Sequence, residues 1–150
     1  TLTDAKQRAV GLLARREHSE KELRNKMRAR DFESEIVDEL IEQLRNENLQ
    51  SDSRYTEAFV HDRIGKGYGP LHILQELKQK GIRDELREEF VDETDQQWQI
   101  QIDDVYARKY GANPPDDYKE QARRSRFLQH RGFSSEHIHR LFKKIKDNDD

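Results

Sequence analysis

The sequence contains no cysteine, which excludes a disulfide scaffold, a thiol nucleophile and a thiolate metal site. No apolar run approaches the roughly 18 residues that a membrane span needs, and no signal-peptide pattern opens the chain. Three prolines and seven glycines are too few for a chain rich in β-turns. These absences predict a helical, soluble, cytoplasmic protein with no membrane contact.

Charge of both signs is abundant but nearly balanced. The 28 basic and 31 acidic residues leave a net charge of -3 over 150 residues. The chain as a whole therefore does not attract polyanions, and any binding to nucleic acid needs local basic patches. Leu, Ile, Val and Phe together make up 22% of the chain, just above the level typical of disordered proteins. We expect folding around small cores.

The stretch 36–44 shows the spacing of an amphipathic helix. Its apolar residues recur at steps of three and four, which places them on one helix face opposite a row of carboxylates. They are Ile36, Val37, Leu40, Ile41 and Leu44. The abundance of Glu, Lys, Arg and Gln also favours helix throughout the chain.

The chain repeats itself at intervals of 50 and 51 residues when three apolar anchors are aligned, namely Phe32, Ile82 and Phe133. A basic residue near the end of the preceding helix is followed, directly before each anchor, by a residue that tolerates the left-handed backbone of a helix C-terminus. These residues are Asp31, Gly81 and Gly132. A helix is thus expected to end at each anchor.

Each repeat also has an apolar i, i+4 pair on an earlier helix. The pairs are Ala5 with Ala9, Tyr55 with Phe59, and Tyr106 with Tyr110. Start signals, including Pro70 after Gly69 and the capping box at Ser19, complete the boundaries. They predict helices at 3–16, 19–30, 34–47, 52–66, 70–80, 84–94, 96–110, 117–131 and 135–146.

The predicted fold class is all-α, a tandem array of three three-helix repeats. We expect repeat boundaries at 1–50, 51–95 and 96–150, because units this small bury little alone and must share interfaces with their neighbours. Such an array would be elongated and solenoid-like. The alternative is one compact helical bundle with coincidental self-similarity.

Charge alternates along the chain. Residues 5–30 carry a net +6 and residues 31–47 a net -6, while residues 83–104 carry -7 and residues 119–146 carry +7. Any one run can be a solvated helix face with i, i+4 ion pairs. Two basic segments together also suit a charged partner, and Tyr68, Tyr118 and Phe127 could stack on bases unless they are core residues.

No catalytic, metal or cofactor site is predicted. The segment 65–70 is rich in glycine but follows a helix rather than a strand, so a phosphate loop is not expected. His137 and His139 point apart on a helix and lack a third ligand. His18 and His72 are expected at polar surface or hinge positions rather than as general bases.

Four segments in order over nearly the whole chain, at 12–23, 54–63, 67–82 and 126–134, resemble the bacterial RecX family of regulatory proteins. The third is the most specific, with Gly-Tyr-Gly-Pro at 67–70 followed by Glu76-Leu77 and Lys80-Gly81-Ile82 at fixed spacing. His72 departs from the family, which commonly has Arg there. A partner contact at this position would be weaker or pH-sensitive.

The resemblance implies a non-enzymatic modulator of the RecA recombinase built from tandem three-helix repeats. Such a protein binds RecA filaments on single-stranded DNA and inhibits RecA ATP hydrolysis, strand exchange and filament extension. We expect a monomer without a cofactor. Its expected partners are the RecA filament and single-stranded DNA, which it would contact either directly or through RecA. Two alternatives stay open, a general nucleic-acid-binding helical module and a helical-repeat adaptor for another protein.

We hypothesise that basic side chains contact RecA carboxylates or DNA phosphates. They are Arg15, Arg16, Lys21, Arg63, Lys66, Lys78, Lys80, Arg123, Arg124, Arg126 and Arg131. Tyr68 and Pro70 would shape the turn between two helices of the middle repeat. The motifs do not say which residues touch the partner, and Lys80 and Arg131 can also act as helix C-terminal charges.

Overall fold

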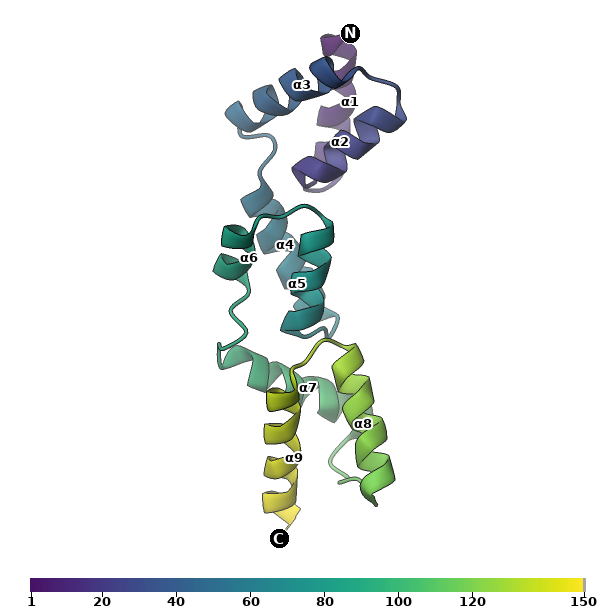
Figure 1. The fold of residues 1–150 in the computed structure, drawn as a ribbon, viewed down its shortest axis with the longest axis vertical. Helices are drawn as coiled ribbons and strands as arrows, with labels where there is room; N and C mark the ends of the chain where they lie inside the picture. The colour runs from purple at the N-terminus through teal and green to yellow at the C-terminus, as the bar shows by residue number, and fades with distance from the viewer. Residues whose placement is uncertain (150) are drawn as a thin grey trace. The chain divides into compact units, whose positions relative to one another are not determined.

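The computed structural model describes residues 1–149, and all regular structure in that range is helical (Figure 1). The predicted all-α class is therefore confirmed. None of these helices has the length and apolar character needed to cross a membrane. The helices are α1 (Leu2–Arg15), α2 (Glu20–Ala29), α3 (Ser34–Asn46), α4 (Asp52–Gly65), α5 (Pro70–Gln79), α6 (Asp84–Phe90), α7 (Gln97–Tyr110), α8 (Tyr118–His130) and α9 (Ser135–Asp149).

The predicted helix ranges agree with the structure to within one residue at each end, except at two C-termini. Helix α6 ends at Phe90 rather than at 94. The reason is local, because Asp92 Oδ1 accepts hydrogen bonds from the amide of Thr94 at 3.0 Å and from its hydroxyl at 2.6 Å. An aspartate that bonds the backbone two residues ahead competes with helix continuation. Helix α9 continues past 146 to Asp149.

The three aligned helix ends adopt one backbone motif. Asp31, Gly81 and Gly132 have positive φ angles of 65°, 79° and 98°. The amide of each following anchor donates to the carbonyl five residues earlier, as Phe32 does to Met27 at 3.3 Å and Phe133 to Leu128 at 3.1 Å. This bond defines the Schellman cap, which satisfies carbonyls that a helix leaves unpaired at its end. The left-handed residues predicted from the repeat are confirmed.

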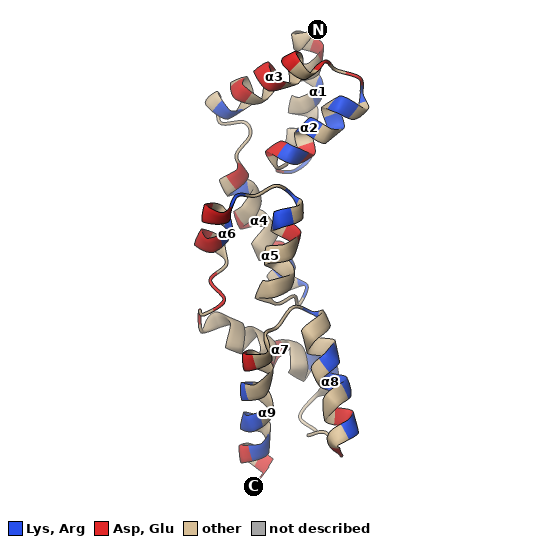
Figure 2. Cartoon of the chain, viewed as in Figure 1, with Lys and Arg blue, Asp and Glu red and all other residues tan. Residues whose placement is uncertain are grey.

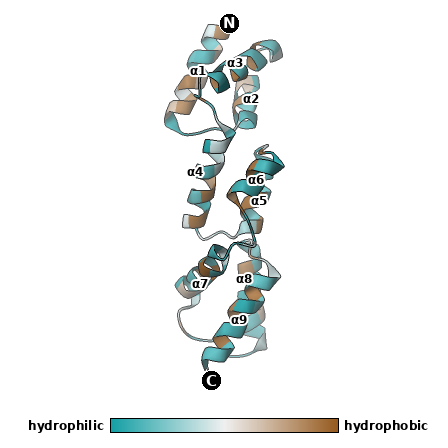
Figure 3. Ribbon diagram, turned by 90° about the vertical axis from the view of Figure 1, so that its left-hand side faces the viewer, coloured by the Kyte–Doolittle hydropathy of each residue, from teal (hydrophilic) through white to brown (hydrophobic). Residues whose placement is uncertain are grey.

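The i, i+4 pairs and the anchors are largely interior. Tyr55 and Phe59 are buried with ring centroids 5.8 Å apart, and the rings of Tyr106 and Tyr110 lie 5.2 Å apart. Ala5, Ala9, Ile82 and Phe133 are also buried. Phe32 is partly buried and packs against the core of α1, α2 and α3. The helices alternate apolar and polar bands along their length (Figure 3), as amphipathic helices do.

The chain forms two compact units. The first comprises Thr1–Phe59 with Leu77–Phe90, and the second comprises Val60–Glu76 with the described residues from Val91 onward. Each has its own apolar core. The first core includes Leu23, Met27, Leu40, Ile41 and Leu44, and the second includes Ile102, Leu128, Phe133, Leu141 and Phe142.

Candidate partner-binding surface

Basic side chains of the first unit gather around one carboxylate. Arg16 donates two hydrogen bonds to Glu22, at 3.2 and 2.9 Å, and Lys80 Nζ lies 3.7 Å from the same carboxylate. Glu22 also accepts the backbone N–H of Ser19 at 3.1 Å and so completes the predicted capping box of α2. Arg16 and Lys80, both among the cations hypothesised from the sequence to contact a partner, instead share this one internal acid.

The Glu22 carboxylate has a strongly perturbed ionisation. Its burial opposes the charged form, but hydrogen bonds from Arg16 and Ser19 and the charges of Arg16 and Lys80 outweigh burial. They lower its pKa from 4.5 to about 2. This carboxylate is therefore ionised over the whole physiological pH range. It links α2 to Arg16, just before the helix, and to Lys80, after α5.

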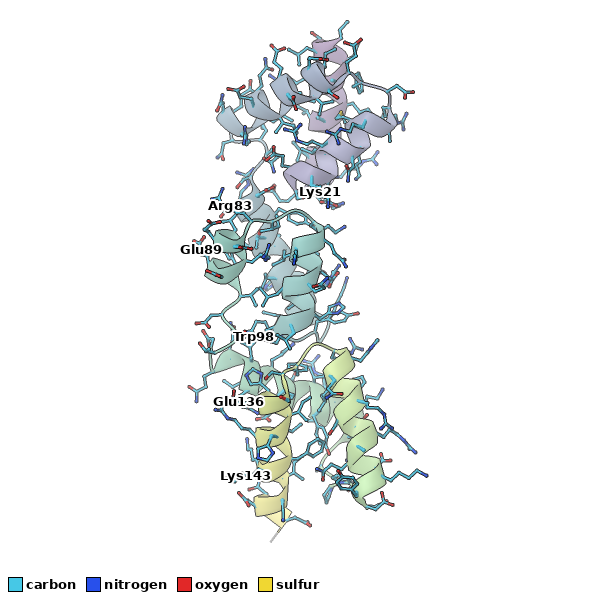
Figure 4. The ribbon with its side chains drawn as sticks, in the orientation of Figure 1. Lys21, Arg83, Glu89, Trp98, Glu136 and Lys143 are labelled. Atoms are coloured by element: carbon cyan, nitrogen blue, oxygen red, sulfur yellow. The ribbon has the colours of Figure 1, made fainter. Side chains whose placement is uncertain are left out.

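Lys21 is exposed, but its ammonium group is bound to the C-terminal end of α5. Its Nζ donates to the backbone carbonyl of Gln79 at 2.9 Å, which places a cation at the negative end of a helix dipole. The side chain lies so close to Gly81 that a Cβ there would stand 2.9 Å from Lys21 Cβ. Lys21, labelled in Figure 4, thus has a local structural role. Arg15 and Lys78 are exposed cations of the same unit.

In the second unit, Arg63 and Lys66 are engaged by acids of their own neighbourhood. Arg63 Nε lies 3.0 Å from Glu76 Oε1, and Asp62 Oδ2 lies 2.5 Å from Arg63 Nη1 and 3.2 Å from Lys66 Nζ. Glu76 is shared with His72, whose Nε2 lies 2.9 Å from Oε1. Glu76 therefore contacts both Arg63 and His72 within the second unit.

Arg131 is held between aromatic rings. Its guanidinium carbon lies 4.9 Å from the Tyr68 ring centroid and 5.4 Å from that of Phe127, and its Nη1 donates to the Lys66 carbonyl at 3.2 Å. Tyr68 stacks in turn on His72, with centroids 4.4 Å apart. Such contacts fix a guanidinium in place without neutralising it.

Arg124 is interior and does not form part of an exposed surface. Only 9% of it is accessible, and its guanidinium donates to the Tyr106 hydroxyl at 2.6 Å, to the Asn113 carbonyl at 2.9 Å and to Glu120 at 3.2 Å. Arg123 and Arg126, its neighbours on α8, are exposed. Alternation of exposure along a helix separates these three arginines, which the sequence presents as one basic cluster.

A groove in the second unit brings together four cations, namely Lys66, Arg108, Lys109 and Arg131. We call these residues the basic groove. Its volume is about 430 Å³, and its apolar walls include Ile64, Val105 and Phe127. Lys109 Nζ lies 4.1 Å from the Phe127 ring centroid, and Arg108 Nε lies 3.0 Å from Asp104.

Arg108 and Lys109 were not among the residues expected from sequence. They lie four and five residues after Asp104, where the acidic run ends, and their adjacent positive charges in the last turn of α7 were the only available signal. Figure 2 shows blue on α2, α8 and α9 and red on α3 and α6, in agreement with the predicted alternation of charge.

His18 corrects a sequence expectation. It was expected at a polar surface or hinge position, but it is 2% exposed. Its Nδ1 lies 3.0 Å from the Arg16 carbonyl and its Nε2 lies 2.8 Å from Lys26 Nζ. A neutral ring that donates from Nδ1 and accepts at Nε2 satisfies both contacts. Burial lowers its pKa, the charges of Arg16 and Lys26 add to this effect, and together they outweigh the hydrogen bond to the Arg16 carbonyl, which raises it.

Comparisons with known proteins match three family descriptions in chain order. Residues 5–44 match "RecX, first three-helix domain", residues 51–90 match the second and residues 95–142 the third. The chain is 42% identical over 141 residues to Regulatory protein RecX of Pseudomonas fluorescens (strain SBW25), covering 94% of this chain and 91% of the relative. It is 37% identical over 142 residues to Regulatory protein RecX of Halorhodospira halophila (strain DSM 244 / SL1), covering 95% and 88%.

Two solved structures share the fold. The crystal structure of RecX from Lactobacillus salivarius superposes with a TM-score of 0.77 at 23% identity, covering 97% of this chain and 96% of that one. A crystal structure of regulatory protein RecX superposes with a TM-score of 0.78 at 22% identity, covering 95% and 71%. Helix order and packing are therefore similar at low sequence identity.

Proposed function

The chain belongs to the RecX family of regulatory proteins, and we propose that it binds RecA filaments on single-stranded DNA and inhibits RecA ATP hydrolysis, strand exchange and filament extension. The role needs no catalytic residue and no cofactor of its own. It belongs to DNA recombination and repair in the cytoplasm, and a monomer suffices for it. In this proposal the chain is built from three three-helix repeats, with boundaries near residues 50 and 95.

The observation that carries the proposal is the family match over 94% of the chain at 42% identity. The structure adds exposed cations on both units, which include Arg15 and Lys78 on the first and Arg123 and Arg126 on the second. Several weak sites on one chain can combine into tight binding to a repetitive filament, because the later contacts form at high effective concentration.

Arg16, Lys21, Arg63, Lys80 and Arg124 are better explained by contacts inside the protein. Each has a carboxylate, carbonyl or hydroxyl partner within hydrogen-bond distance or, for Lys80, an acid at 3.7 Å. We therefore assign direct partner contact first to the exposed cations that have no acid nearby, Arg15, Lys78 and Arg126, and then to Lys66, Arg123 and Arg131.

The decisive experiment is the single-strand-DNA-dependent ATP hydrolysis of RecA with this protein titrated far below the RecA concentration. Strong inhibition at substoichiometric protein supports filament modulation, because one bound molecule then affects many protomers. Absence of inhibition at equimolar folded protein, with the filament formed, contradicts the proposal. Binding to the same DNA without RecA is measured in parallel.

The alternatives give different results in that pair of measurements. A general nucleic-acid-binding module would bind bare DNA tightly and affect RecA only by competition for DNA, which the net charge of -3 does not favour. An adaptor for another protein would leave RecA filaments unaffected.

A further inference from the structure

The exposed side of α8 is a line of basic residues. Lys119, Arg123, Arg126 and His130 are all exposed and follow one another at steps of four, three and four residues. At 100° per residue these steps keep the four side chains on one face, opposite Leu128, which is fully buried. We call them the α8 stripe. The eleven residue steps from Lys119 to His130 span about 16 Å of helix.

The α8 stripe borders the basic groove. Phe127 and Arg131 line the groove and follow Arg123 at four-residue steps, so the cations of the groove continue those of the stripe on the same helix and its C-terminus. Acids on this surface are few. Each of three acids forms an ion pair with one of the cations. Asp104 pairs with Arg108 at 3.0 Å, Asp62 with Lys66 at 3.2 Å and Glu120 with Arg123 at 3.1 Å. Lys109, Arg126 and Arg131 have no acidic partner among the described residues.

An exposed aromatic ring begins the same helix. Tyr118 is 85% exposed and is the most exposed large apolar residue of the described chain. It precedes Lys119 directly. An aromatic ring in water has no stabilising role in a core, whereas it offers a face on which an unpaired base can stack.

We propose that the basic groove and the α8 stripe form a binding surface for single-stranded DNA, with phosphates against the cations and a base stacked on Tyr118. A phosphodiester chain repeats its negative charge at every nucleotide, which suits a line of basic side chains over about 16 Å. The apolar walls of the groove accommodate sugars, and Arg131, already fixed between two rings, loses little freedom on binding phosphate. Single-stranded DNA is thus the ligand proposed for one part of the surface that the proposed function assigns to partner contact. The proposal rests on that function only for its biological context.

The test measures fluorescence anisotropy of a labelled oligo-dT with the full chain over a salt series. The groove variant carries Arg108→Gln and Lys109→Gln, the stripe variant Arg123→Gln and Arg126→Gln, and a third variant Tyr118→Ala. The control carries Lys143→Gln and Lys146→Gln, which remove the same charge from exposed positions of α9 in the same unit and do not line the groove. Lys143 is labelled in Figure 4. Circular dichroism checks that every variant is folded.

The proposal predicts that the groove and stripe variants each bind oligo-dT roughly tenfold more weakly than the control at low salt. Each should also flatten the slope of log affinity against log salt by about 1.4, since each lost phosphate contact on a single strand accounts for about 0.7. Tyr118→Ala should weaken binding with the slope unchanged, because stacking releases no counterion. Groove and stripe variants that bind like the control overturn the proposal, as does failure of the wild type to bind at low salt.

The RecA ATPase assay separates this inference from the proposed function. If the wild type inhibits RecA while the groove and stripe variants bind oligo-dT like the control, the function stands and the DNA surface is wrong. If those variants lose oligo-dT binding while the wild type does not inhibit RecA, the DNA surface stands and the function is wrong. A third outcome is that the groove and stripe variants bind oligo-dT like the control but no longer bind RecA in the absence of DNA. That outcome would assign the groove to carboxylates of RecA and would also overturn the inference.

Discussion

Gly69 and Gly132 lie in direct backbone contact, so that a Cβ on Gly69 would stand 2.6 Å from the carbonyl carbon and oxygen of Gly132. The amide of Gly69 donates to the Arg131 carbonyl at 2.7 Å, and that of Leu71 donates to the Gly132 carbonyl at 2.9 Å. The start of α5 is thereby hydrogen-bonded to the end of α8, within the second unit. Glycine at both positions permits an approach that no side chain allows.

Gly69→Ala should destabilise the protein by about 1–3 kcal/mol, because the added methyl meets backbone atoms that cannot move aside cheaply. Gly132→Ala should cost at least as much, since its φ of +98° disfavours any side chain and its Cβ would lie 2.4 Å from His72 Cβ. Urea denaturation measures both. Wild-type stability in both variants would contradict the close contact.

Gly11→Ala should have the opposite effect. Gly11 lies inside α1, and an added Cβ would meet no atom within 4 Å. Alanine in a helix interior is more favourable than glycine by about 0.5–1 kcal/mol, chiefly because it lowers the entropy of the unfolded chain. An increase of that size in the free energy of unfolding is expected. A decrease would mean that α1 does not tolerate a side chain there.

Acid should remove the stability that Glu22 contributes. The folded-state pKa of Glu22 is depressed to about 2 from 4.5, so its contribution is fully present above pH 4.5 and is lost as pH falls towards 2. Glu22→Gln should therefore destabilise the protein by about 2–3 kcal/mol at pH 7. The difference between wild type and variant in denaturant melts should shrink between pH 4.5 and 2. A constant difference across that range would contradict the role of the charge.

His18 should make stability sensitive to milder acid. Burial lowers its pKa below the model-peptide value of 6.5, so the unfolded chain binds a proton that the folded chain resists. Its stabilising contribution is present above pH 6.5 and declines as pH falls below that value. His18→Gln should flatten the decline in melting temperature between pH 7.5 and 5.5. Burial also lowers the pKa of His137, so His137→Gln serves as the second variant, and an unchanged wild-type profile in both would contradict this account.

Arg124→Met should lower stability without directly affecting partner binding. The substitution breaks the bond to Tyr106 and leaves a buried hydroxyl without that donor, for a loss of about 2–3 kcal/mol. Arg123→Met, one residue earlier and exposed, should change stability by less than about 0.5 kcal/mol. Thermal melts of the pair measure this contrast. Equal stability of the two variants, with RecA inhibition lost only in Arg124→Met, would instead place Arg124 at the partner.

Most of the fold could be predicted because its signals are local. The helix ends at Phe32, Ile82 and Phe133 follow from a left-handed residue before an apolar one, and the structure shows the same Schellman bond at each. The end of α6 was wrong by four residues because the Asp92 side chain competes with the helix over a span of only two residues. That turn resembles a helical pattern in composition.

The candidate surface could be predicted only in part. Arg123, Arg124 and Arg126 are neighbours in the sequence and so were predicted to act as one cluster. In the structure Arg124 is buried, whereas the other two are exposed. Arg108 and Lys109 went unnoticed because they follow an acidic run and reach Lys66 and Arg131 only through packing of α7 against distant segments. Exposure and pairing of a charge depend on residues far away in the chain.

The sequence by itself determined the helices, their caps and the family, because hydrophobic periodicity, capping residues and spaced motifs act over a few residues or at fixed spacing. Tertiary structure alone decided which cations are available. Glu22 and Glu76 form ion pairs with Arg16 and Arg63, and the Tyr106 hydroxyl accepts a hydrogen bond from Arg124. Arg131 lies between the rings of Tyr68 and Phe127 and lines the groove. The reason is physical: a charge is free or engaged according to what folding brings within a few ångströms of it.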